Sequence, residues 1–483
     1  MMETGHLQNG NSTISEQAKT KRARRKVSKK KQQKEVKANF LTITRQEHKE
    51  EEDHNVLVSF YTKQQQFAVP RSAISVPDDT NPVGLNQIVS TLIQQSTFTG
   101  TVPVFDFLVD GALLSGKLIH YLNSSESVSR EGGLSIEYLE QLPPPTPRDA
   151  LKHDDWVSSL HYGANHYLVT GCYDKTVHIW HPRTALSKSK EHKLSDDVNA
   201  HKLAIPDAHK APVKAVSWIP KSNNRFISCG MDQSVLVWEW CPTSNTVHCV
   251  YDCRGHTQSI ESVAVSADGK LFATGAWDGA LKIWTTDEEG VTEKTENVKE
   301  PNMKRSKVTL EGPKCKTPRF TLSDHSQSVS GLVWPTLGTL ASCSWDNSVR
   351  LWDIEEQKKL KQYVAPCNCM ALDASPFNNT ILVTTMDTHV RLLDPREDEC
   401  LSLTKVYQHH KNWVNSVKWS PSNENHFATG GFDNVVKLWD IRGARAPLFE
   451  MLSHEGKVFA IDWSSPGLLF SASADTNVKM FTI

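Results

Sequence analysis

The sequence predicts an all-β propeller of seven blades that follows a small α+β domain and a basic, disordered tail. Two observations carry this prediction: a strand-turn-strand pattern recurs seven times in the second part of the chain, and a non-repeating stretch of mixed helix and strand patterns precedes it. The clearest copy is "TGAWDGALKIW", which ends at Trp284. The turn aspartates of the seven copies are Asp174, Asp232, Asp278, Asp346, Asp387, Asp433 and Asp475. Their spacings of 58, 46, 68, 41, 46 and 42 residues are typical of propeller repeats with two insertions.

Each copy has the residues of two short strands joined by a tight turn. Small and β-branched residues precede the aspartate, and an alternating apolar run such as "ALKIW" follows it. Asp-Gly and Asp-Asn favour the backbone angles of such a turn. A histidine recurs upstream of six copies, at His153, His209, His256, His325, His410 and His454. We interpret this repeated device as structural, because a hydrolytic Ser-His-Asp site occurs once in a chain rather than in every repeat.

Residues 1–54 are predicted to be a disordered basic extension. The first forty residues hold eleven Lys and Arg against three Asp and Glu, and "KTKRARRKVSKKKQQK" contains almost no apolar side chains. Clustered charge of this kind indicates nuclear import, and the alternative is a tail that only keeps the chain soluble. The residues of the import cluster are Lys21, Arg22, Arg24, Arg25 and Lys26.

Residues 55–141 are predicted to form one domain. Strands are expected at "NVLVSFYT", "QQFAVP", "VFDFLVDG" and "LSIEYLE", a helix at "VGLNQIVSTLIQQ" and a short turn at "LIHYL". Asn81-Pro82 is a helix start signal, because proline fits the first helical turn. The ββαββ order indicates a ubiquitin-like fold.

Two further segments are predicted to lie outside the repeats. Residues 142–151 form a Pro-rich linker. About Pro147 to Leu151 are expected to supply the outer strand that the last blade lacks, since Ile483 directly follows its third strand. Within the propeller, residues 152–483, the polar stretch from Thr285 to Pro318 (about 285–318) is predicted to be a disordered insertion.

Composition argues against several classes of protein. The chain has 483 residues, 38% of them apolar, and a net charge of −1, which permits two or three domains with large cores. No long apolar segment indicates a membrane span, and the ten cysteines include no CxxC pair, which favours reduced thiols. The sequence contains no phosphate-binding loop, Gly-x-Ser-x-Gly motif or zinc-ligand spacing, so we predict neither an enzyme nor an intrinsic cofactor or metal.

The repeats "GHTQSI...TGAWDGALKIW" and "DHSQSV...SCSWDNSVRLWD" resemble the WD-repeat (WD40) family from about Lys152 to Ile483. The resemblance implies a seven-bladed propeller in which His, Ser or Thr, Asp and Trp form a hydrogen-bonded chain inside each blade. The matching residues are His153, Thr170, Asp174 and Trp180; His209, Ser228, Asp232 and Trp238; His256, Thr274, Asp278 and Trp284; His325, Ser342, Asp346 and Trp352; and His410, Thr429, Asp433 and Trp439. The fifth repeat has Ala365, Val383 and Leu393 at the His, hydroxyl and Trp positions, so we expect apolar packing alone to hold it.

The stretches "FYTKQQQFAVP", "FDFLVDGALLSGKLIHYL" and "LSIEYLEQLPPP", followed by "HDDWVSSL", resemble the Notchless-like amino-terminal domain that is joined to a propeller in the WD-repeat subunit of the Pescadillo–Bop complex. The resemblance implies a non-enzymatic factor of the nucleolus and nucleoplasm that acts on the large-subunit preribosome and in rRNA maturation. It implies Bop-family and Pescadillo-family partners, and a ubiquitin-like domain that binds the AAA ATPase midasin. By the same resemblance, Glu131 in "SREGGLSIEY" would complete the coordination of a Mg²⁺ ion held by midasin.

Two tryptophans are candidates for exposed anchors of a partner of the propeller. Trp156 and Trp413 each directly precede an apolar strand, although tryptophans in such loops are as often half-buried. The sequence leaves open which face of the propeller binds which partner and whether rRNA is contacted directly. An alternative function is that of an adaptor for ubiquitin ligation or nuclear signalling, since the propeller fold does not determine function.

Overall fold

The structure is a computed structural model that describes residues 55–95, 100–124, 133–163, 165–182, 201–222, 224–292, 312–396 and 403–483. The predicted disordered extension 1–54, with its import cluster, lies outside the described residues, as does Glu131.

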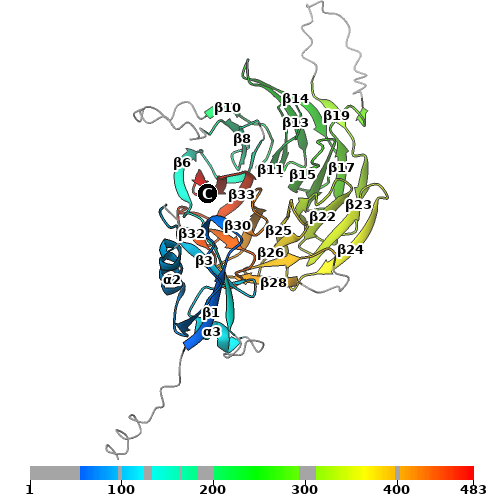
Figure 1. The fold of residues 1–483 in the computed structure, drawn as a ribbon. Coiled ribbons are helices and arrows are strands. Elements are labelled where there is room, and N and C mark those ends of the chain that lie inside the picture. Colours follow the sequence, from blue (N-terminus) through cyan, green and yellow to red (C-terminus); the bar gives the residue numbers. More distant parts are fainter. Residues whose placement is uncertain are drawn as a thin grey trace, which may run out of the picture. The chain divides into compact units, whose positions relative to one another are not determined.

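The amino-terminal part of the chain forms one five-stranded sheet (Figure 1). Its strands are β1 (Asn55–Tyr61), β2 (Ala73–Pro77), β3 (Phe105–Val109), β4 (Ala112–Leu113) and β5 (Leu134–Glu140), in the order β2-β1-β5-β3-β4. Helix α2 (Pro82–Gln95) follows β2 and buries Leu85, Val89 and Ile93 at four-residue spacing. Asn81 caps it, because its Oδ1 accepts the backbone N–H of Gly84 at 2.9 Å. The ubiquitin-like class and the helix start signal are confirmed.

Two local predictions in this part are wrong. "QQFAVP" is not a strand: Gln65–Phe67 forms a 3-10 turn, η1, which anchors the buried Phe67, and the second strand is Ala73–Pro77 instead. Local hydrogen bonds from Phe67 N and Ala68 N to the preceding turn use the donors that a sheet ladder would need, and Pro70 has none. "LIHYL" is not a turn but starts α3 (Leu118–Ser124), whose first N–H groups bond to carbonyls of Asp78 and Thr80.

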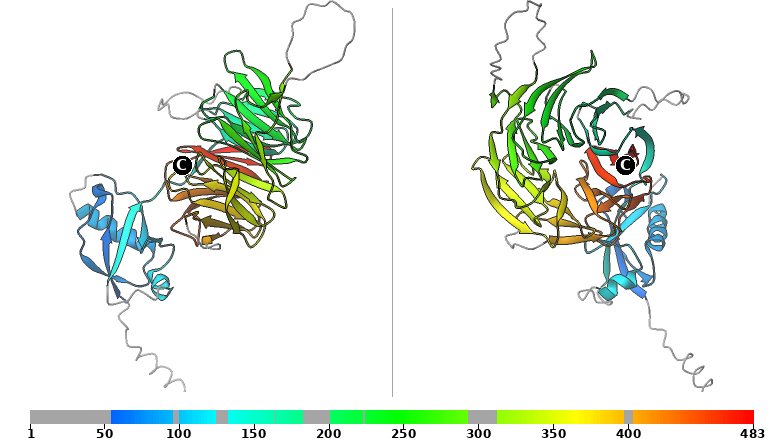
Figure 2. Two further views of the ribbon diagram at one scale, coloured as in Figure 1. Left: turned by 90° about the vertical axis from the view of Figure 1, so that its right-hand side faces the viewer. Right: turned by 180° about the vertical axis from the view of Figure 1, so that it is seen from behind.

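Seven further sheets form the propeller (Figures 1 and 2). Their innermost strands, β7, β11, β15, β21, β25, β29 and β33, each contact the next, and β33 contacts β7, so the ring is closed. Blades 1 to 3 comprise β7 (Val157–Tyr162), β8 (Leu168–Cys172), β9 (Val177–Trp180) and β10 (His201–Ile205); β11 (Val213–Trp218), β12 (Arg225–Gly230), β13 (Val235–Cys241) and β14 (Thr246–Cys253); and β15 (Ile260–Val265), β16 (Leu271–Ala276), β17 (Leu281–Thr285) and β20 (Phe320–Leu322). Blades 4 and 5 comprise β21 (Val329–Val333), β22 (Thr339–Ser344), β23 (Ser348–Asp353) and β24 (Lys358–Val364); and β25 (Cys369–Ala374), β26 (Ile381–Thr385), β27 (His389–Leu393) and β28 (Leu403–Gln408). Blades 6 and 7 comprise β29 (Val414–Trp419), β30 (His426–Gly431), β31 (Val436–Asp440) and β32 (Phe449–Met451); and β33 (Val458–Ser465), β34 (Leu468–Ser473), β35 (Asn477–Thr482) and β6 (Thr146–Lys152).

The last blade takes its outer strand from before the first blade. Strand β6 pairs antiparallel with β35, with Val478 opposite Leu151 and Thr482 opposite Thr146. The sequence predicts this pairing for about Pro147 to Leu151, and the structure starts the strand one residue earlier. Because β6 covers the edge of β35, residues from both ends of the propeller segment close the ring.

The ends of the insertion are ordered, so the prediction of a disordered loop over Thr285–Pro318 is wrong for them. Strands β18 (Val291–Thr292) and β19 (Lys314–Lys316) pair with each other, and β19 adds in parallel to β14 of blade 2. Lys316 is buried and donates to the carbonyls of Thr285 and Asp287. The physical reason is that a buried ammonium finds its acceptors only when both ends of the insertion meet. Residues 293–311 lie outside the described part.

Candidate functional site

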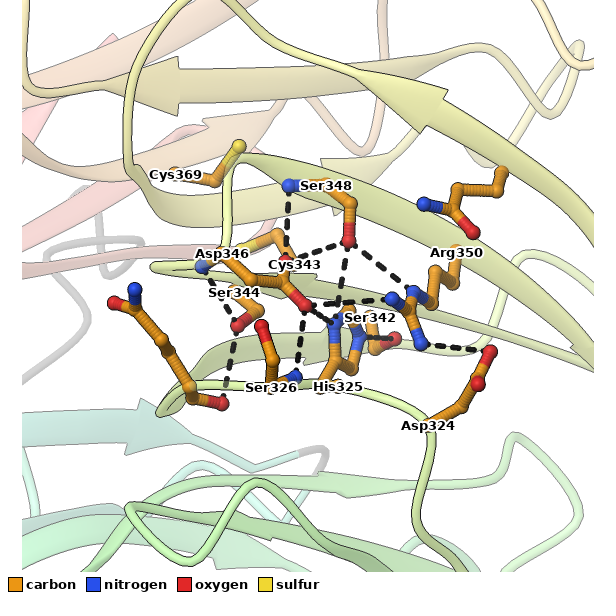
Figure 3. Close-up of polar contacts among 12 residues, drawn as sticks. Asp324, His325, Ser326, Ser342, Cys343, Ser344, Asp346, Ser348, Arg350 and Cys369 are labelled. Atoms are coloured by element: carbon orange, nitrogen blue, oxygen red, sulfur yellow. Dashed lines mark hydrogen bonds and ion pairs between the residues drawn. The ribbon is translucent and has the colours of Figure 1, made fainter.

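Blade 4 contains all four members of the predicted hydrogen-bonded chain, and Figure 3 shows three of them, His325, Ser342 and Asp346. His325 Nδ1 lies 2.8 Å from Asp346 Oδ2, and His325 Nε2 lies 2.8 Å from Ser342 Oγ. Trp352 Nε1 donates to the same Ser342 oxygen at 2.8 Å. Since a carboxylate only accepts, His325 carries its proton on Nδ1, and Ser342 therefore donates to Nε2. The hydrogen bonds therefore all point in one direction, with Trp352 donating to Ser342, Ser342 to His325 and His325 to Asp346.

The surroundings of Asp346 keep it ionised. Ser326 N and Ser348 N donate to it at 3.1 and 3.0 Å, and Ser348 Oγ does so at 2.6 Å. Burial raises the pKa of Asp346, but the hydrogen bonds from His325 and Ser348 outweigh it and hold the pKa below its ordinary value. Burial also lowers the pKa of His325, which keeps the imidazole neutral.

This Ser-His-Asp connectivity is that of a hydrolytic triad, but its setting is not catalytic. Ser342 has no exposed surface, and its oxygen already accepts the indole N–H of Trp352. A nucleophile must reach a substrate, whereas this hydroxyl is enclosed by its own partners. The geometry therefore favours the structural interpretation of the repeated residues.

Three other blades bring the same four residue types together. The His Nδ1 to Asp distances are 3.1, 3.1 and 2.9 Å in blades 2, 3 and 6, and the Trp Nε1 to hydroxyl distances are 2.8, 2.9 and 2.8 Å. The chains are His209–Asp232 with Ser228 and Trp238, His256–Asp278 with Thr274 and Trp284, and His410–Asp433 with Thr429 and Trp439. Blade 7 has His454, Ser471 and Asp475, but Phe481 replaces the tryptophan and donates nothing.

Blade 1 departs from the predicted chain. His153 Nε2 and Trp180 Nε1 both bond to Thr170, but His153 Nδ1 lies 3.2 Å from the carbonyl oxygen of Leu151 instead of bonding to Asp174. Asp174 accepts the backbone N–H and the hydroxyl of Thr176, at 2.9 and 2.5 Å. The prediction that Asp174 ends the chain of blade 1 is therefore wrong, because the Leu151 carbonyl takes the His153 Nδ1 contact, while Thr176 donates to Asp174 as Ser348 donates to Asp346 in blade 4.

An aromatic surface lies where the first strands of blades 6, 7 and 1 begin. We call Trp156, Tyr173, Trp413, Phe432 and Phe459 the aromatic collar. Trp156 and Trp413 are 47% and 41% exposed. The ring centroids are 5.5 Å apart for Trp156 and Tyr173, 5.9 Å for Trp156 and Phe459, 5.7 Å for Phe432 and Phe459, and 5.9 Å for Trp413 and Phe432. The two predicted anchors thus belong to one continuous set of rings.

Sequence reasoning missed three members of the collar. Tyr173 and Phe432 directly precede turn aspartates, as do Trp277 and Trp345 in blades 3 and 4, whose rings are 5.5 Å apart. An apolar residue before the turn aspartate is the signal that could have found Tyr173 and Phe432, whereas Phe459 is the second residue of β33 and has no such signal. All of these residues except Trp156 line a channel of about 800 Å³. Exposed aromatic side chains around a concave opening are typical of surfaces that bind proteins.

Comparison with known proteins shows the family. Residues 56–122 match the NLE (NUC135) domain, and the WD domain, G-beta repeat, matches residues 146–181, 201–239, 247–285, 316–353, 401–440 and 445–482. A "Ribosome biogenesis protein WDR12 homolog" of Aedes aegypti is 37% identical over 425 residues, which cover 87% of this chain and 94% of that protein. The homolog of Ixodes scapularis is 34% identical over 437 residues, which cover 89% of this chain and 99% of that protein. The chain belongs to the WDR12 family of ribosome biogenesis proteins.

This WDR12-family chain has seven blades but only six matched repeats. The unmatched stretch contains β25, β26 and β27 of blade 5. The expectation that apolar packing alone holds this blade is wrong, because Arg391 Nη1 donates to Asp387 at 2.8 Å and Thr385 Oγ1 does so at 2.5 Å. Arg391 is buried, and its guanidinium supplies the donors that the missing histidine would supply.

Among the described residues, no helix is long and apolar enough to cross a membrane. Within the same residues, no three His, Cys, Asp or Glu side chains are grouped so that they could hold a metal ion. No disulfide joins the nine cysteines that the structure describes.

Proposed function

We propose that this ribosome biogenesis factor is a non-enzymatic scaffold that joins two partners during maturation of the large ribosomal subunit and its rRNA. Its propeller binds a Bop-family protein, which in turn associates with a Pescadillo-family protein, and its ubiquitin-like domain binds a midasin-type AAA ATPase. The observation that carries the proposal is the presence of an NLE domain and WD repeats in one chain, in the order found along nearly the full length of the WDR12 homologs. The expected location is the nucleus, with the nucleolus and nucleoplasm as sites of assembly.

The aromatic collar supports the propeller's part in this proposal. Trp156 and Trp413 offer large apolar surfaces that are half exposed, and Lys457 Nζ lies 5.0 Å from the centroid of the Phe432 ring. Rigid aromatic side chains lose little conformational freedom when a partner covers them, so they commonly contribute most of the binding energy. We assign the Bop-family contact to this surface.

The ubiquitin-like domain's part depends on Glu131, in the segment between α3 and β5. Gly133, at the described end of that segment, has a φ of +73°, a conformation that glycine adopts without strain. A glutamate here can donate one carboxylate oxygen to a Mg²⁺ ion that the ATPase holds, since hard cations prefer oxygen ligands. The chain itself needs no cofactor in this scheme.

The experiment that tests both parts is affinity purification of the tagged full-length chain from nuclear extract, in Mg²⁺ and in chelator. We expect Bop- and Pescadillo-family proteins in both eluates and midasin only in Mg²⁺. Trp413→Ala combined with Trp156→Ala should remove the Bop-family protein and leave midasin. The matched control is Trp277→Ala, which changes an equally exposed tryptophan, 44% accessible, that lies outside the collar.

Recovery of ubiquitin-ligase subunits in place of these proteins would refute the proposal in favour of an adaptor. If the collar variant keeps the Bop-family protein, the contact lies on another face of the propeller. Crosslinking to rRNA in the same preparation decides whether the chain touches RNA directly.

A further inference from the structure

A lysine lies between the two exposed tryptophans of the aromatic collar. Trp413, Lys457 and Trp156 each directly precede the first strand of a blade, β29, β33 and β7 respectively. Strand β33 contacts both β29 and β7, so blade 7 lies between the two blades that carry the tryptophans. Lys457 therefore occupies, in the middle of this surface, the repeat position that a tryptophan occupies on either side.

The ammonium group of Lys457 lies against the rings of the collar. Its Nζ is 5.0 Å from the centroid of the Phe432 ring, which lies 5.9 Å from the ring of Trp413. Phe459, two residues after Lys457, lies 5.7 Å from Phe432 and 5.9 Å from Trp156. Lys457 is exposed, and electrostatic attraction favours a cation above an aromatic face. A partner that covers both tryptophans must therefore cover this ammonium group as well.

Lys457 differs from the other lysine that contacts the collar. Lys214 Nζ lies 5.5 Å from the centroid of the Tyr173 ring, and Glu261 Oε1 balances its charge at 2.8 Å. For Lys457, the part of the chain that the structure describes supplies neither an ion pair nor a hydrogen bond to the ammonium group. The chain thus neutralises one lysine of this surface and leaves the charge of the other unbalanced.

A partner that docks on the collar removes water from the ammonium group of Lys457. The loss of hydration is unfavourable unless another group replaces the water. A carboxylate replaces it best, because it balances the charge and also accepts the hydrogen bonds of the ammonium group. The collar therefore favours a partner surface that presents an acidic side chain between apolar ones.

Building on the proposed contact between the collar and a Bop-family protein, we propose that Lys457 binds an aspartate or glutamate of that partner. The carboxylate lies between the apolar side chains that cover Trp156 and Trp413. The ring of Phe432 positions the ammonium group, so the lysine loses less conformational freedom when the carboxylate binds. Lys457 is thus a specificity-determining residue of this surface.

The test measures binding of the purified full-length chain to the Bop-family protein that is recovered with it, by calorimetry at several salt concentrations. We expect Lys457→Met to weaken binding about 30-fold, a change of about 2 kcal/mol, because it leaves the partner's carboxylate buried and unpaired. The affinity of this variant should also fall less steeply with salt. Lys457→Arg should keep most of the affinity, since it keeps the charge.

The matched control is Lys210→Met, which removes one charge from an exposed lysine of blade 2 outside the collar. It should change the affinity less than about threefold. Both lysines are exposed, so all three variants should keep the melting temperature of the unchanged chain. Equal effects of Lys457→Met and Lys210→Met would overturn the proposal, because net charge rather than a specific pair would then control binding.

A scan of the partner identifies the carboxylate. Its aspartates and glutamates are changed one at a time to asparagine and glutamine. We expect one of these changes to weaken binding as much as Lys457→Met does, and the two together to cause little further loss. Strict additivity for every acidic residue would overturn the proposal. Loss of the Lys457 effect after phosphatase treatment of the partner would also overturn it, because the anion would then be a phosphate.

The outcomes for Lys457 and for the collar as a whole are distinguishable. Full binding by Lys457→Met, with loss of the partner from Trp156→Ala combined with Trp413→Ala, overturns the role of Lys457 and leaves the proposed function intact. Full binding by both of these variants overturns the role of Lys457 and the assignment of the Bop-family contact to the collar together.

Discussion

Replacing Ser342 by alanine should destabilise the propeller more than the same change at Ser471. Both hydroxyls are fully buried and both bond to a histidine Nε2, at 2.8 Å for His325 and 2.6 Å for His454. Ser342 also accepts the indole N–H of Trp352, whereas blade 7 has Phe481 at the tryptophan position, and phenylalanine has no donor. Ser342→Ala therefore leaves two buried groups without partners, and Ser471→Ala leaves one.

The magnitude follows from the number of groups left unsatisfied. Each buried donor or acceptor without a partner costs about 1–3 kcal/mol, so we expect about 2–6 kcal/mol for Ser342→Ala and about 1–3 kcal/mol for Ser471→Ala. Trp352→Phe removes the indole donor and keeps the ring. Adding Trp352→Phe to Ser342→Ala should recover part of the lost free energy of unfolding, because it removes the indole N–H that Ser342→Ala leaves without an acceptor.

The assay is urea unfolding of the full-length variants, followed by tryptophan fluorescence and circular dichroism. The free energies come from the midpoints, provided that the two probes coincide and the slopes stay equal. Equal losses for Ser342→Ala and Ser471→Ala would refute the reasoning, because the indole bond would then contribute nothing. Strict additivity of Ser342→Ala and Trp352→Phe would do the same.

The remaining predictions concern closure, acid, the partner ATPase and import. Deleting residues 146–152 removes β6 from the edge of β35 and should lower the melting temperature sharply. Deleting Pro143 to Pro145 alone should not lower it. An unchanged melting curve for the first deletion contradicts the role of β6. Burial raises the pKa of Asp278, but hydrogen bonds from His256 and Thr257 outweigh this effect and bring the pKa to about 2. The ionised carboxylate therefore stabilises the fold above about pH 4, and this stabilisation is lost as the pH falls toward 2. Calorimetry between these values should show a falling melting temperature, with a weaker dependence in Asp278→Asn. Glu131→Ala should keep the melting temperature and the Bop-family partner but lose midasin in pull-downs. Glu131→Asp should bind midasin partly, because its side chain is one methylene shorter and holds the oxygen farther from the cation. Midasin binding by Glu131→Ala that resists chelator rules the site out. Replacing Lys21, Arg22, Arg24, Arg25 and Lys26 by alanine should leave a fluorescent fusion partly cytoplasmic, whereas unaltered nuclear accumulation would mean that the chain enters bound to its partners.

The sequence by itself determined the architecture of the propeller. Alternating apolar runs and Asp-centred turns are local signals that are weak when they occur once. Their seven-fold repetition makes the prediction of a propeller specific. It also determined the composition of the buried hydrogen-bonded chains in blades 2, 3, 4 and 6, because the hydroxyl and the tryptophan keep a constant distance from the turn aspartate and the histidine lies 21 to 23 residues before it. The helix start at Asn81-Pro82 is equally local, since a cap depends only on its own first turn.

Tertiary structure decided the features that depend on partners distant in the chain. Strand β19 pairs with β14, whose residues lie more than sixty positions earlier in the chain. This pairing requires that the folded blade 2 has a free edge. The aromatic collar belongs to the same class, because the contacts between its rings join residues of different blades.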